Sequence, residues 1–335
     1  MIKYADVIVD LQAGDTGKGK VCNSLSKIEN EYTHVIRYNG GGNAGHTIYQ
    51  DGKKIVTHFI PSGIINGLKS IIGPGCVVDI NKFFKEIEEL KSLGIDTDGK
   101  IFIDKRVNII TEEHLVEDSK DVKIGTTKTG NGPCYRDKYF RKGKRAEEFD
   151  ELEKYIIDIY FELHGEEDCK ILFEGAQGFE LDVDWGDYPY VTSSHCTVGS
   201  AVLNGVPPQK IRKVYGVSKA YNTYVGAKKY ENQSDIFNKI REIGNEYGAT
   251  TGRPRQIGWT DIDKLIKACN LNGVTHLVVN KVDILQKIGE FSIIVNNLPY
   301  TINDVNFLED YFNSVIKENC PLVEEIIFSY SQDSI

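Results

Sequence analysis

The chain has 335 residues, of which 40% are apolar and 27% are charged, and its formal net charge is −9. This negative charge argues against a partner of nucleic acid, because affinity for duplexes comes from Lys and Arg on the phosphate backbone. The sequence has neither the long apolar run of a membrane span nor the N-terminal pattern of a signal peptide, so we expect a cytoplasmic protein without a membrane partner.

Short β-branched runs alternate with amphipathic segments, which is typical of an α/β fold with a mostly parallel central sheet and helices on both faces. Strands are predicted at 5–11, 34–38, 69–72, 76–80, 100–103, 170–173, 213–218, 275–280 and 324–329. Helices are predicted at 81–93, 150–163, 235–247, 261–272 and 305–318 from apolar residues at helical spacing. Because no repeat or proline-rich linker divides the chain, we expect one domain over residues 1–335 with long active-site loops.

The first predicted strand leads directly into Gly14-Asp-Thr-Gly-Lys-Gly-Lys20. Glycine lets backbone N–H groups turn toward an anion, lysine neutralises phosphate oxygens, and the following helix adds the positive end of its dipole. The spacing fits the P-loop pattern, but Val21 stands where a P-loop has the Ser or Thr that holds Mg²⁺. We therefore predict a polyphosphate site with Asp15 as a metal ligand, against the plainer alternative of an ordinary strand-to-helix corner.

Other loops rich in Gly, Asn, Thr and Arg begin where predicted strands end, and ligands of open α/β sheets bind beyond the carboxyl ends of strands. These loops cover 39–46, 125–133, 174–178, 190–194 and 250–255. His46 closes the first loop, and a histidine there is as consistent with proton transfer as with a passive cap. Arg253 and Arg255 bracket a proline, which favours a carboxylate or phosphate partner over a solvated basic loop.

Asn280-Lys-Val-Asp283 directly follows the apolar run 277–279, so it emerges at the end of a predicted strand. The pattern N-K-x-D is one by which nucleotide-binding proteins recognise guanine, since the carboxylate accepts hydrogen bonds from the base. Four residues also match by chance, and Asn and Asp often cap turns. Together with the phosphate loop, the motif favours GTP over ATP.

Two further features receive structural interpretations. The seven cysteines contain no C-x-x-C pair, which fits neither a disulfide framework nor a zinc site, so we interpret them as small buried hydrophobic residues. The basic segment 141–145 would by itself be a solvated surface.

Taken in order, the motifs resemble those of adenylosuccinate synthetases along nearly the whole chain. Besides the phosphate loop, the matching segments are Asn43-Ala-Gly-His-Thr47, His58-Phe-Ile-Pro-Ser-Gly63, Ile124-Gly-Thr-Thr127, Gly132-Pro-Cys-Tyr-Arg-Asp-Lys138, Phe173-Glu-Gly-Ala-Gln-Gly178, Tyr188-Pro-Tyr-Val-Thr-Ser-Ser194, Lys219-Ala-Tyr221, Val225-Gly-Ala227 and Thr250-Thr-Gly-Arg-Pro-Arg255. The resemblance implies a purine-biosynthesis ligase that joins L-aspartate to C6 of IMP to form adenylosuccinate. GTP would be hydrolysed to GDP and phosphate through a 6-phosphoryl intermediate.

The resemblance also implies roles for individual residues. Catalysis would involve Asp15 as the base for the purine N1 proton, together with His46, Lys18 and Gln177. The purine nucleotide would be bound by Asn43, Thr127, Arg141, Gln177, Thr192 and Val225, and L-aspartate by Thr250, Thr251, Arg253 and Arg255. GTP would be bound by Gly14, Thr16, Gly17, Lys18, Gly19, Lys20, Lys281 and Asp283, and Mg²⁺ by Asp15 and the Gly45 carbonyl. Arg141 would reach the site of a neighbouring subunit, which implies a homodimer with shared active sites.

The chain departs from the family pattern at several positions. Thr16 stands where the family has Glu, and Asp10-Leu-Gln-Ala13 stands where it usually shows Gly and then Gln-Trp. Loop 225–231 lacks the usual Gly-Pro-Phe-Pro-Thr continuation, and residues 329–335 lack the Gly-Pro-x-Arg turn that completes the guanine pocket in relatives.

The opening Leu-Gln-x-Gly-x-Thr-Gly-Lys-Gly is similar to a viral branch of the family that converts dGMP to its 2-amino product for diaminopurine DNA. That branch usually lacks the acid at the position of Asp15, so IMP is the first expectation for the substrate. GMP or dGMP, with GTP or ATP as co-substrate, remains the alternative, and a viral source would place the protein in the host cytoplasm. A further alternative is a nucleotide-binding regulator without catalysis, which would predict damage at Asp15, His46 or Gln177, and none is visible in the sequence. Another is a GTPase switch, against which Val21 and the additional anion-binding loops argue.

Overall fold

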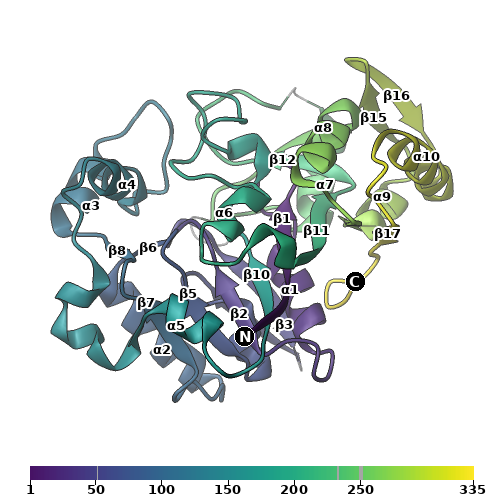
Figure 1. Ribbon diagram of the computed structural model, residues 1–335. Coiled ribbons are helices and arrows are strands. Elements are labelled where there is room, and N and C mark those ends of the chain that lie inside the picture. Colours follow the sequence, from purple (N-terminus) through teal and green to yellow (C-terminus); the bar gives the residue numbers. More distant parts are fainter. Residues whose placement is uncertain (51, 232–233, 249–251) are drawn as a thin grey trace.

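The computed structural model describes residues 1–50, 52–231, 234–248 and 252–335. In these residues the largest sheet has nine strands in the order β17-β14-β11-β1-β10-β2-β5-β7-β9, all paired in parallel (Figure 1). The strands are β1 (Ile2–Asp10), β2 (His34–Arg37), β5 (Lys69–Ile72), β7 (Ile101–Asp104), β9 (Ile156–Ile157), β10 (Cys169–Glu174), β11 (Ile211–Lys219), β14 (His276–Asn280) and β17 (Glu325–Phe328). The predicted fold class, a mostly parallel α/β sheet, is confirmed.

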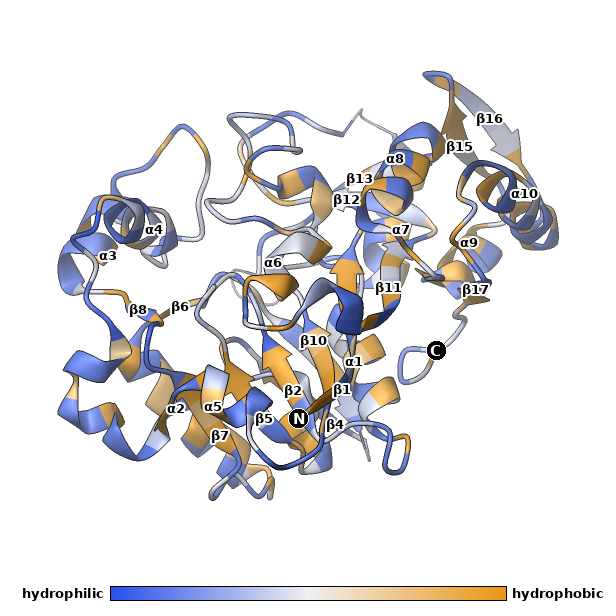
Figure 2. Cartoon of the chain, in the orientation of Figure 1, coloured by the Kyte–Doolittle hydropathy of each residue, from blue (hydrophilic) through white to orange (hydrophobic). Residues whose placement is uncertain are grey.

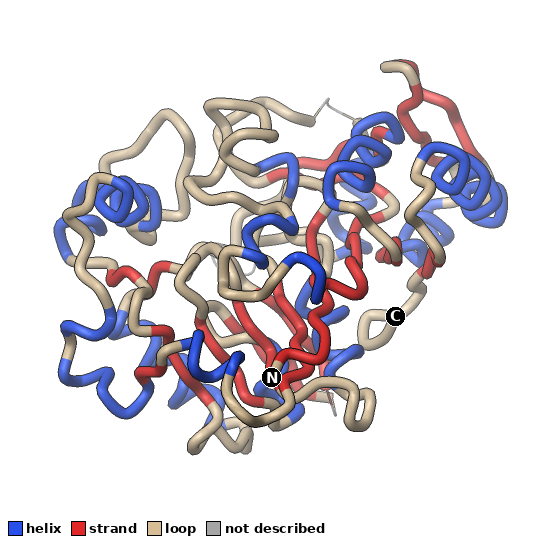
Figure 3. Tube along the Cα trace, viewed as in Figure 1, coloured by secondary structure: helices blue, strands red, loops and turns tan. Residues whose placement is uncertain are grey.

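Helices connect and cover the sheet, as the tube in Figure 3 shows. The α-helices are α1 (Lys18–Ser26), α2 (Ile80–Ser92), α3 (Glu112–Ser119), α4 (Asn131–Tyr139), α5 (Ile159–His164), α6 (Val198–Val202), α7 (Asp235–Gly244), α8 (Ile262–Asn272), α9 (Val282–Ile288) and α10 (Val305–Asn319). The 3₁₀ helices are η1 (Ser62–Asn66), η2 (Ala146–Glu148), η3 (Asp150–Tyr155), η4 (Phe179–Leu181) and η5 (Pro208–Lys210). None of the helices in the described residues combines the length and apolar character needed to cross a membrane.

The central strands are buried on both faces, which explains why they are apolar at consecutive positions. Val7 and Val9 of β1 belong to one apolar cluster, and the intervening Ile8 belongs to another with Val21 of α1. Figure 2 shows the same distribution, with apolar strands inside and polar helix faces outside. All seven cysteines are buried and unpaired, which confirms their interpretation as small apolar residues.

The prediction of one continuous helix over 150–163 is wrong, because residues 156–157 form a strand. The segment forms η3, then β9, and then α5. Ile156 and Ile157 pair in parallel with β7, because β-branched residues at an open sheet edge gain more from pairing than from a helix. Asp158 then starts α5, its side chain accepting a hydrogen bond from the Tyr160 N–H at 3.0 Å.

Several short strands were not predicted. They form small sheets outside the main one and comprise β3 (His46–Gln50), β4 (Lys53–Thr57), β8 (Asn108–Ile109), β12 (Tyr221–Tyr224), β13 (Gln256–Asp261), β15 (Phe291–Val295) and β16 (Leu298–Ile302). The strand predicted at 76–80 is present as β6 (Val77–Val78), which pairs with β8 outside the main sheet. β16 is exposed along most of its length and contains Pro299, so it lacks the apolar period by which strands are recognised.

The arrangement of the sheet explains the position of the loops with predicted functions. β1, β2, β10, β11 and β14 run parallel and are neighbours or near neighbours in the sheet. Their carboxyl ends therefore lie at one edge, and the loops that follow them converge there.

Candidate functional site

The predicted phosphate loop connects β1 to α1 through left-handed backbone. Gly14, Asp15 and Gly17 have φ angles of 89°, 56° and 102°, a region that glycine adopts freely and other residues rarely. A Cβ at Gly17 would lie 2.7 Å from the side-chain amide of Asn280, so this position requires glycine. Lys18 begins α1 at the cleft, and Gly17 makes no side-chain cap, an arrangement suited to an anion at the helix N-terminus.

Lys18 already has two protein partners in this structure. Its Nζ donates to Asp10 Oδ2 at 2.7 Å and to the carbonyl oxygen of Gln177 at 2.6 Å. The same Asp10 oxygen accepts the Thr16 hydroxyl at 2.6 Å. Sequence analysis gave Asp10 no role, although a carboxylate at the last position of an apolar strand before a glycine-rich loop was a usable signal.

Asp15 is joined to a buried chain of charged groups. Arg255 Nε donates to Asp15 Oδ2 at 2.8 Å, and the NH1 of the same guanidinium donates to Glu246 Oε2 at 2.6 Å. Lys219 Nζ reaches the same Glu246 oxygen at 3.1 Å. Burial raises the pKa of Asp15, but the positive charges of Arg255 and Lys219 outweigh it and lower that pKa below its ordinary value. Asp15 is therefore ionised, and one of its carboxylate oxygens accepts a hydrogen bond from Arg255.

His46 lies between a carboxylate and a guanidinium, all three of them buried. Its Nδ1 is 2.5 Å from Glu174 Oε1, and its Nε2 is 3.2 Å from Arg37 NH1. Because a guanidinium only donates, Nε2 must accept, so the proton is on Nδ1 and is donated to Glu174. Burial and the nearby Arg37 lower the pKa of His46 to about 4, which makes the ring neutral. The predicted donation to a phosphate therefore requires Nε2 both to leave Arg37 and to gain a proton, because this tautomer carries no hydrogen on Nε2.

Glu174 is held from several directions. The backbone N–H of Ser62 donates to its Oε2 at 2.7 Å, and the Ser62 hydroxyl donates to its Oε1 at 2.5 Å. Burial raises its pKa, but Arg37 and His46 outweigh burial and lower it to about 2. Sequence analysis quoted Glu174 and Ser62 within motifs but assigned them no role, because their contact joins segments far apart in the chain.

Asn43 and Gln177, both predicted to hold the purine nucleotide, are in direct contact. Asn43 Oδ1 accepts the Gln177 Nε2 at 2.9 Å and the Asn131 Nδ2 at 2.6 Å. Gln177 has a φ of 56°, and its Oε1 is buried with no protein partner. A buried amide oxygen without a partner is costly, so this atom is available for a ligand. Asn131 is a further residue that sequence analysis did not single out.

Residues of the predicted guanine motif line the same cleft. Asn280 Nδ2 donates to the carbonyl of Thr16 at 2.7 Å, so this motif also holds the phosphate loop. Lys281 Nζ donates to the carbonyl of Gly244 at 2.8 Å, and Lys287 Nζ donates to Asp283 Oδ2 at 2.9 Å.

Lys20 points toward the C-terminal segment beside that motif. Its Nζ donates to Ser329 Oγ at 2.7 Å and to the carbonyl of Ser331 at 3.0 Å. Burial, reinforced by the charge of Lys281, lowers the pKa of Lys20 to about 8. Ser331 and Gln332 line the cleft, at the position where the resemblance expects a Gly-Pro-x-Arg turn.

Apart from Arg141, every predicted site residue that the structure describes lines this one cleft of about 640 Å³. Thr250 and Thr251, predicted to bind L-aspartate, lie outside the described residues. Arg253 and Arg255 of the same loop are described and line the cleft.

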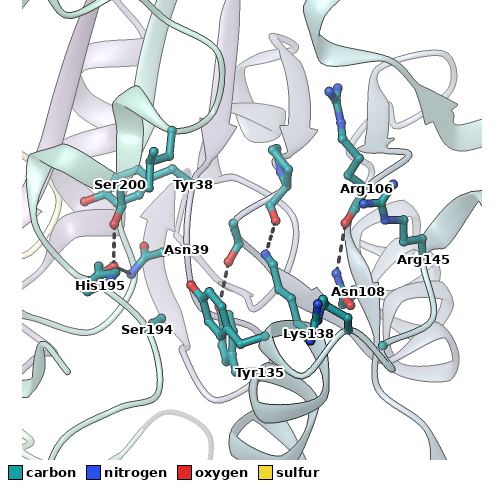
Figure 4. Close-up of a pocket in the computed structure, with 16 residues that line it drawn as sticks. Tyr38, Asn39, Arg106, Asn108, Tyr135, Lys138, Arg145, Ser194, His195 and Ser200 are labelled. Atoms are coloured by element: carbon teal, nitrogen blue, oxygen red, sulfur yellow. Dashed lines mark hydrogen bonds between the residues drawn. The ribbon is translucent and has the colours of Figure 1, made fainter.

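Arg141 lines a second cavity of about 550 Å³, shown in Figure 4. Tyr38, Tyr135, Lys138 and His195 also line it. Two of the polar side chains there hold backbone: Lys138 Nζ donates to the carbonyl of Pro74 at 2.6 Å, and Tyr135 donates to that of Gly75 at 2.8 Å. Within its own subunit, Arg141 is thus separate from the other predicted nucleotide-binding residues.

Comparisons with known proteins find one family for this chain. The sequence model of the family described as adenylosuccinate synthetase matches residues 7–155 and 146–326. The adenylosuccinate synthetase of Thermodesulfovibrio yellowstonii is 38% identical over 373 residues, covering 95% of this chain and 86% of that protein. The enzyme of Acetivibrio thermocellus is 40% identical over 345 residues, covering 86% and 80%.

Two solved structures have a similar fold. The fully ligated adenylosuccinate synthetase of Plasmodium falciparum superposes with a TM-score of 0.83 at 26% identity, covering 98% of this chain and 97% of that one. The succinoaminodeoxyadenylate synthetase of cyanophage S-2L, bound to dGMP and dATP, gives a TM-score of 0.77 at 22% identity, covering 99% and 94%. At this lower identity, the second likeness concerns the fold alone.

Proposed function

The chain belongs to the adenylosuccinate synthetase family, and from that premise we propose that it joins L-aspartate to C6 of IMP with hydrolysis of GTP. One observation carries the proposal most directly. Asp15, His46 and Gln177 line one cleft together with the glycine-rich phosphate loop and with Asn280, Lys281 and Asp283 of the predicted guanine motif. These are the groups needed to transfer a phosphoryl group to a purine oxygen.

The proposed reaction has two steps because the 6-oxygen of a purine is a poor leaving group. In the first, the N1 proton passes to Asp15 while O6 attacks the γ-phosphorus of GTP. The O6–P bond forms, the bond from that phosphorus to the bridging oxygen breaks, and GDP leaves. In the second step, the aspartate amine attacks C6 and forms the new C–N bond. The C6–O bond then breaks, phosphate leaves, and the amine nitrogen loses a proton.

Arg255 must change partners for Asp15 to act as the base. While Arg255 donates to Asp15, it stabilises the ionised carboxylate and weakens its proton affinity. A phosphate or a substrate carboxylate offers the guanidinium a bidentate partner. When Arg255 turns to that anion, the pKa of Asp15 rises toward the range of a useful base. Ligand binding thereby activates Asp15.

The donor set near Asp15 fits Mg²⁺. In the described part of the chain, no cluster of three or more His, Cys, Asp or Glu side chains forms a metal cage. Mg²⁺ in phosphoryl-transfer sites is typically held by one or two protein oxygens together with phosphates and water. The Asp15 carboxylate and the Gly45 carbonyl, both at the cleft, supply such a pair. Bound Mg²⁺ would neutralise charge on the phosphates during transfer.

The separate cavity of Arg141 supports a homodimer in which this arginine completes the partner's nucleotide site. Mixing Asp15→Asn and Arg141→Ala subunits tests the arrangement, because one site of each mixed dimer has both residues. Random exchange should restore about a quarter of wild-type activity. Activity that stays at the level of the two separate variants refutes the shared site.

The purine is tested with a substrate panel. IMP, GMP and dGMP are each supplied with L-aspartate and with GTP or ATP, and phosphate release and product absorbance are measured. The retained Asp15 and the curated relatives favour IMP with GTP, whereas the Leu11-Gln12 opening with Thr16 favours (d)GMP. Phosphate release that requires both IMP and L-aspartate supports the proposal, and release without L-aspartate refutes the ligase. Asp15→Asn should abolish turnover while the nucleotide still binds.

A further inference from the structure

We propose that Asp10 is the residue that positions the phosphate loop: its carboxylate fixes the Lys18 amino group against the backbone of Gln177. The inference rests on the proposed ligase function and deepens it, because it explains how this chain places a positive charge between the triphosphate and purine ends of its cleft. Asp10 itself contacts protein groups and is assigned no contact with a ligand.

Asp10 is buried at the end of β1 and accepts hydrogen bonds on both oxygens. Oδ1 accepts the Gln12 N–H at 2.9 Å. Oδ2 accepts the Thr16 hydroxyl at 2.6 Å and Lys18 Nζ at 2.7 Å. One carboxylate therefore joins the strand, the middle of the loop and the first residue of α1.

Lys18 links this carboxylate to the predicted purine-binding segment. Its amino group has three N–H donors, of which one reaches Asp10 and one reaches the Gln177 carbonyl at 2.6 Å. The third is left for a ligand, and Lys18 lines the cleft. A lysine side chain is flexible in solution, so anchoring two of its donors organises the ammonium before the phosphates arrive.

The segment after β10 is packed tightly against the same carboxylate. A Cβ at Gly178 would lie 2.3 Å from the Gln12 carbonyl and 2.6 Å from Asp10 Oδ1. This close approach brings the Gln177 backbone within reach of Lys18. The phosphate loop and the purine-binding segment thus share one buried anchor.

Asp10 and Thr16 are also two positions at which the chain departs from the family pattern, which has Gly and Glu there. Here the residues at these positions are hydrogen-bonded to one another. In this chain the acid thus stands at the end of the strand, beside Lys18, and the loop position has a hydroxyl. We infer that the two changes form a compensating exchange, in which Asp10 supplies the carboxylate that position 16 lacks.

The exchange is tested by moving the carboxylate back. Asp10→Gly should lower kcat at least about tenfold with IMP while KM for IMP changes less than about twofold, as expected for lost positioning. Asp10→Gly combined with Thr16→Glu should recover most of kcat. The matched double variant with Thr16→Gln should not, because it restores size and hydrogen bonding without the charge. Equal recovery by Glu and Gln, or no recovery by Glu in a folded protein, overturns the proposal.

A crystal structure of Asp10→Asn provides a readout independent of turnover. We expect Lys18 Nζ to leave the Gln177 carbonyl in this variant, which keeps the volume of the side chain. Lys18 remaining at both contacts in the variant overturns the positioning role. A wild-type protein inactive on the whole substrate panel would instead refute the proposed function, and the two failures are distinguishable.

Discussion

His46 Nδ1 lies 2.5 Å from Glu174 Oε1, and both side chains are buried. Because Arg37 donates to Nε2 from the other side, this pair fixes a single neutral tautomer of the ring. Glu174 thereby orients a residue expected to act on the phosphates. The carboxylate, which reaches no ligand itself, is predicted to control the rate through His46.

Glu174→Gln should lower kcat about 100-fold, within the range of lost acid–base function, with a smaller effect on KM for the purine nucleotide. A glutamine amide accepts on one side only, whereas Ser62 and His46 donate to both oxygens of Glu174. One donor must then face an N–H group. Steady-state kinetics on a folded variant measures the effect.

The His34–Glu162 pair provides a matched control. His34 Nε2 lies 2.9 Å from Glu162 Oε1, and neither residue lines the catalytic cleft. Glu162→Gln should leave kcat within about twofold of wild type, because Glu162 contacts His34 and Lys69, neither of which is predicted to meet a substrate. Equal losses in the two variants would show that Glu174 acts through general stability and does not act specifically through His46.

Acid should destabilise the protein through the same pair. The pKa of His46 is about 4 in the folded protein, below its ordinary value of 6.5, so the unfolded chain binds more protons between these values. The free energy of unfolding therefore falls as the pH is lowered from 6.5 to 4, by up to about 3 kcal/mol from this group. The pKa of Glu174, lowered from 4.5 to about 2, extends the loss to more acid pH.

Urea unfolding at pH 7 and pH 5 tests this linkage. His46→Gln should be less stable than wild type at pH 7 and should lose less stability on going to pH 5, since glutamine does not titrate. A variant whose free energy of unfolding falls as steeply as that of wild type would place the acid sensitivity elsewhere.

The sheet could be predicted from sequence because its central strands are buried on both faces. β1 and β14 appear as continuous apolar runs, and the loops after them contain the glycine-rich and Asn280–Asp283 motifs. β9 escaped prediction because only Ile156 and Ile157 pair with the sheet. Two residues are too few to establish a period, and their neighbours suggested a helix.

The cleft was predictable to the extent that its residues occur in local motifs. Asp15 and His46 stand out within glycine-rich loops, but the residues that hold them do not. Glu174 becomes important only when distant strands bring the His46 imidazole to it, and Glu246 only when the chain turns back to place the Arg255 guanidinium against it. The sequence has 49 Asp and Glu residues and does not show which of them are buried. The partners of the buried carboxylates could therefore be identified only from the structure.

Glu246→Gln should destabilise the protein strongly. Its buried carboxylate accepts Arg255 NH1 at 2.6 Å, Tyr221 OH at 2.6 Å and Lys219 Nζ at 3.1 Å. Neutralising it leaves the buried Lys219 without its carboxylate partner, a change that typically costs about 3–5 kcal/mol. Chemical denaturation measures the loss. Glu89→Gln, which removes an exposed partner of Lys85, should cost less than about 1 kcal/mol, and similar costs would contradict the prediction.

Gly178→Ala should impair catalysis through crowding alone. Gly178 has a φ of −154°, which alanine adopts without strain. Any loss of activity in Gly178→Ala therefore comes from the contact of the new methyl group with neighbouring atoms and not from backbone strain. A Cβ there would lie 2.3 Å from the Gln12 carbonyl and 2.7 Å from the Gly14 N–H nitrogen. Both are backbone atoms of the segment that carries the phosphate loop, so the crowding is relieved by moving that segment away from the Gln177–Gly178 backbone.

We expect kcat of Gly178→Ala to fall at least about tenfold, since displacements near 1 Å can cost about 100-fold, while triphosphate binding weakens. Titration with a fluorescent GTP analogue and steady-state kinetics measure the two effects separately. Gly199→Ala is the matched control, because its nearest neighbour would be Thr197 Oγ1 at an ordinary 3.7 Å. If Gly178→Ala keeps wild-type kinetics, the phosphate loop can shift without loss of function, and its proposed anchoring to the Gln177 segment is incorrect.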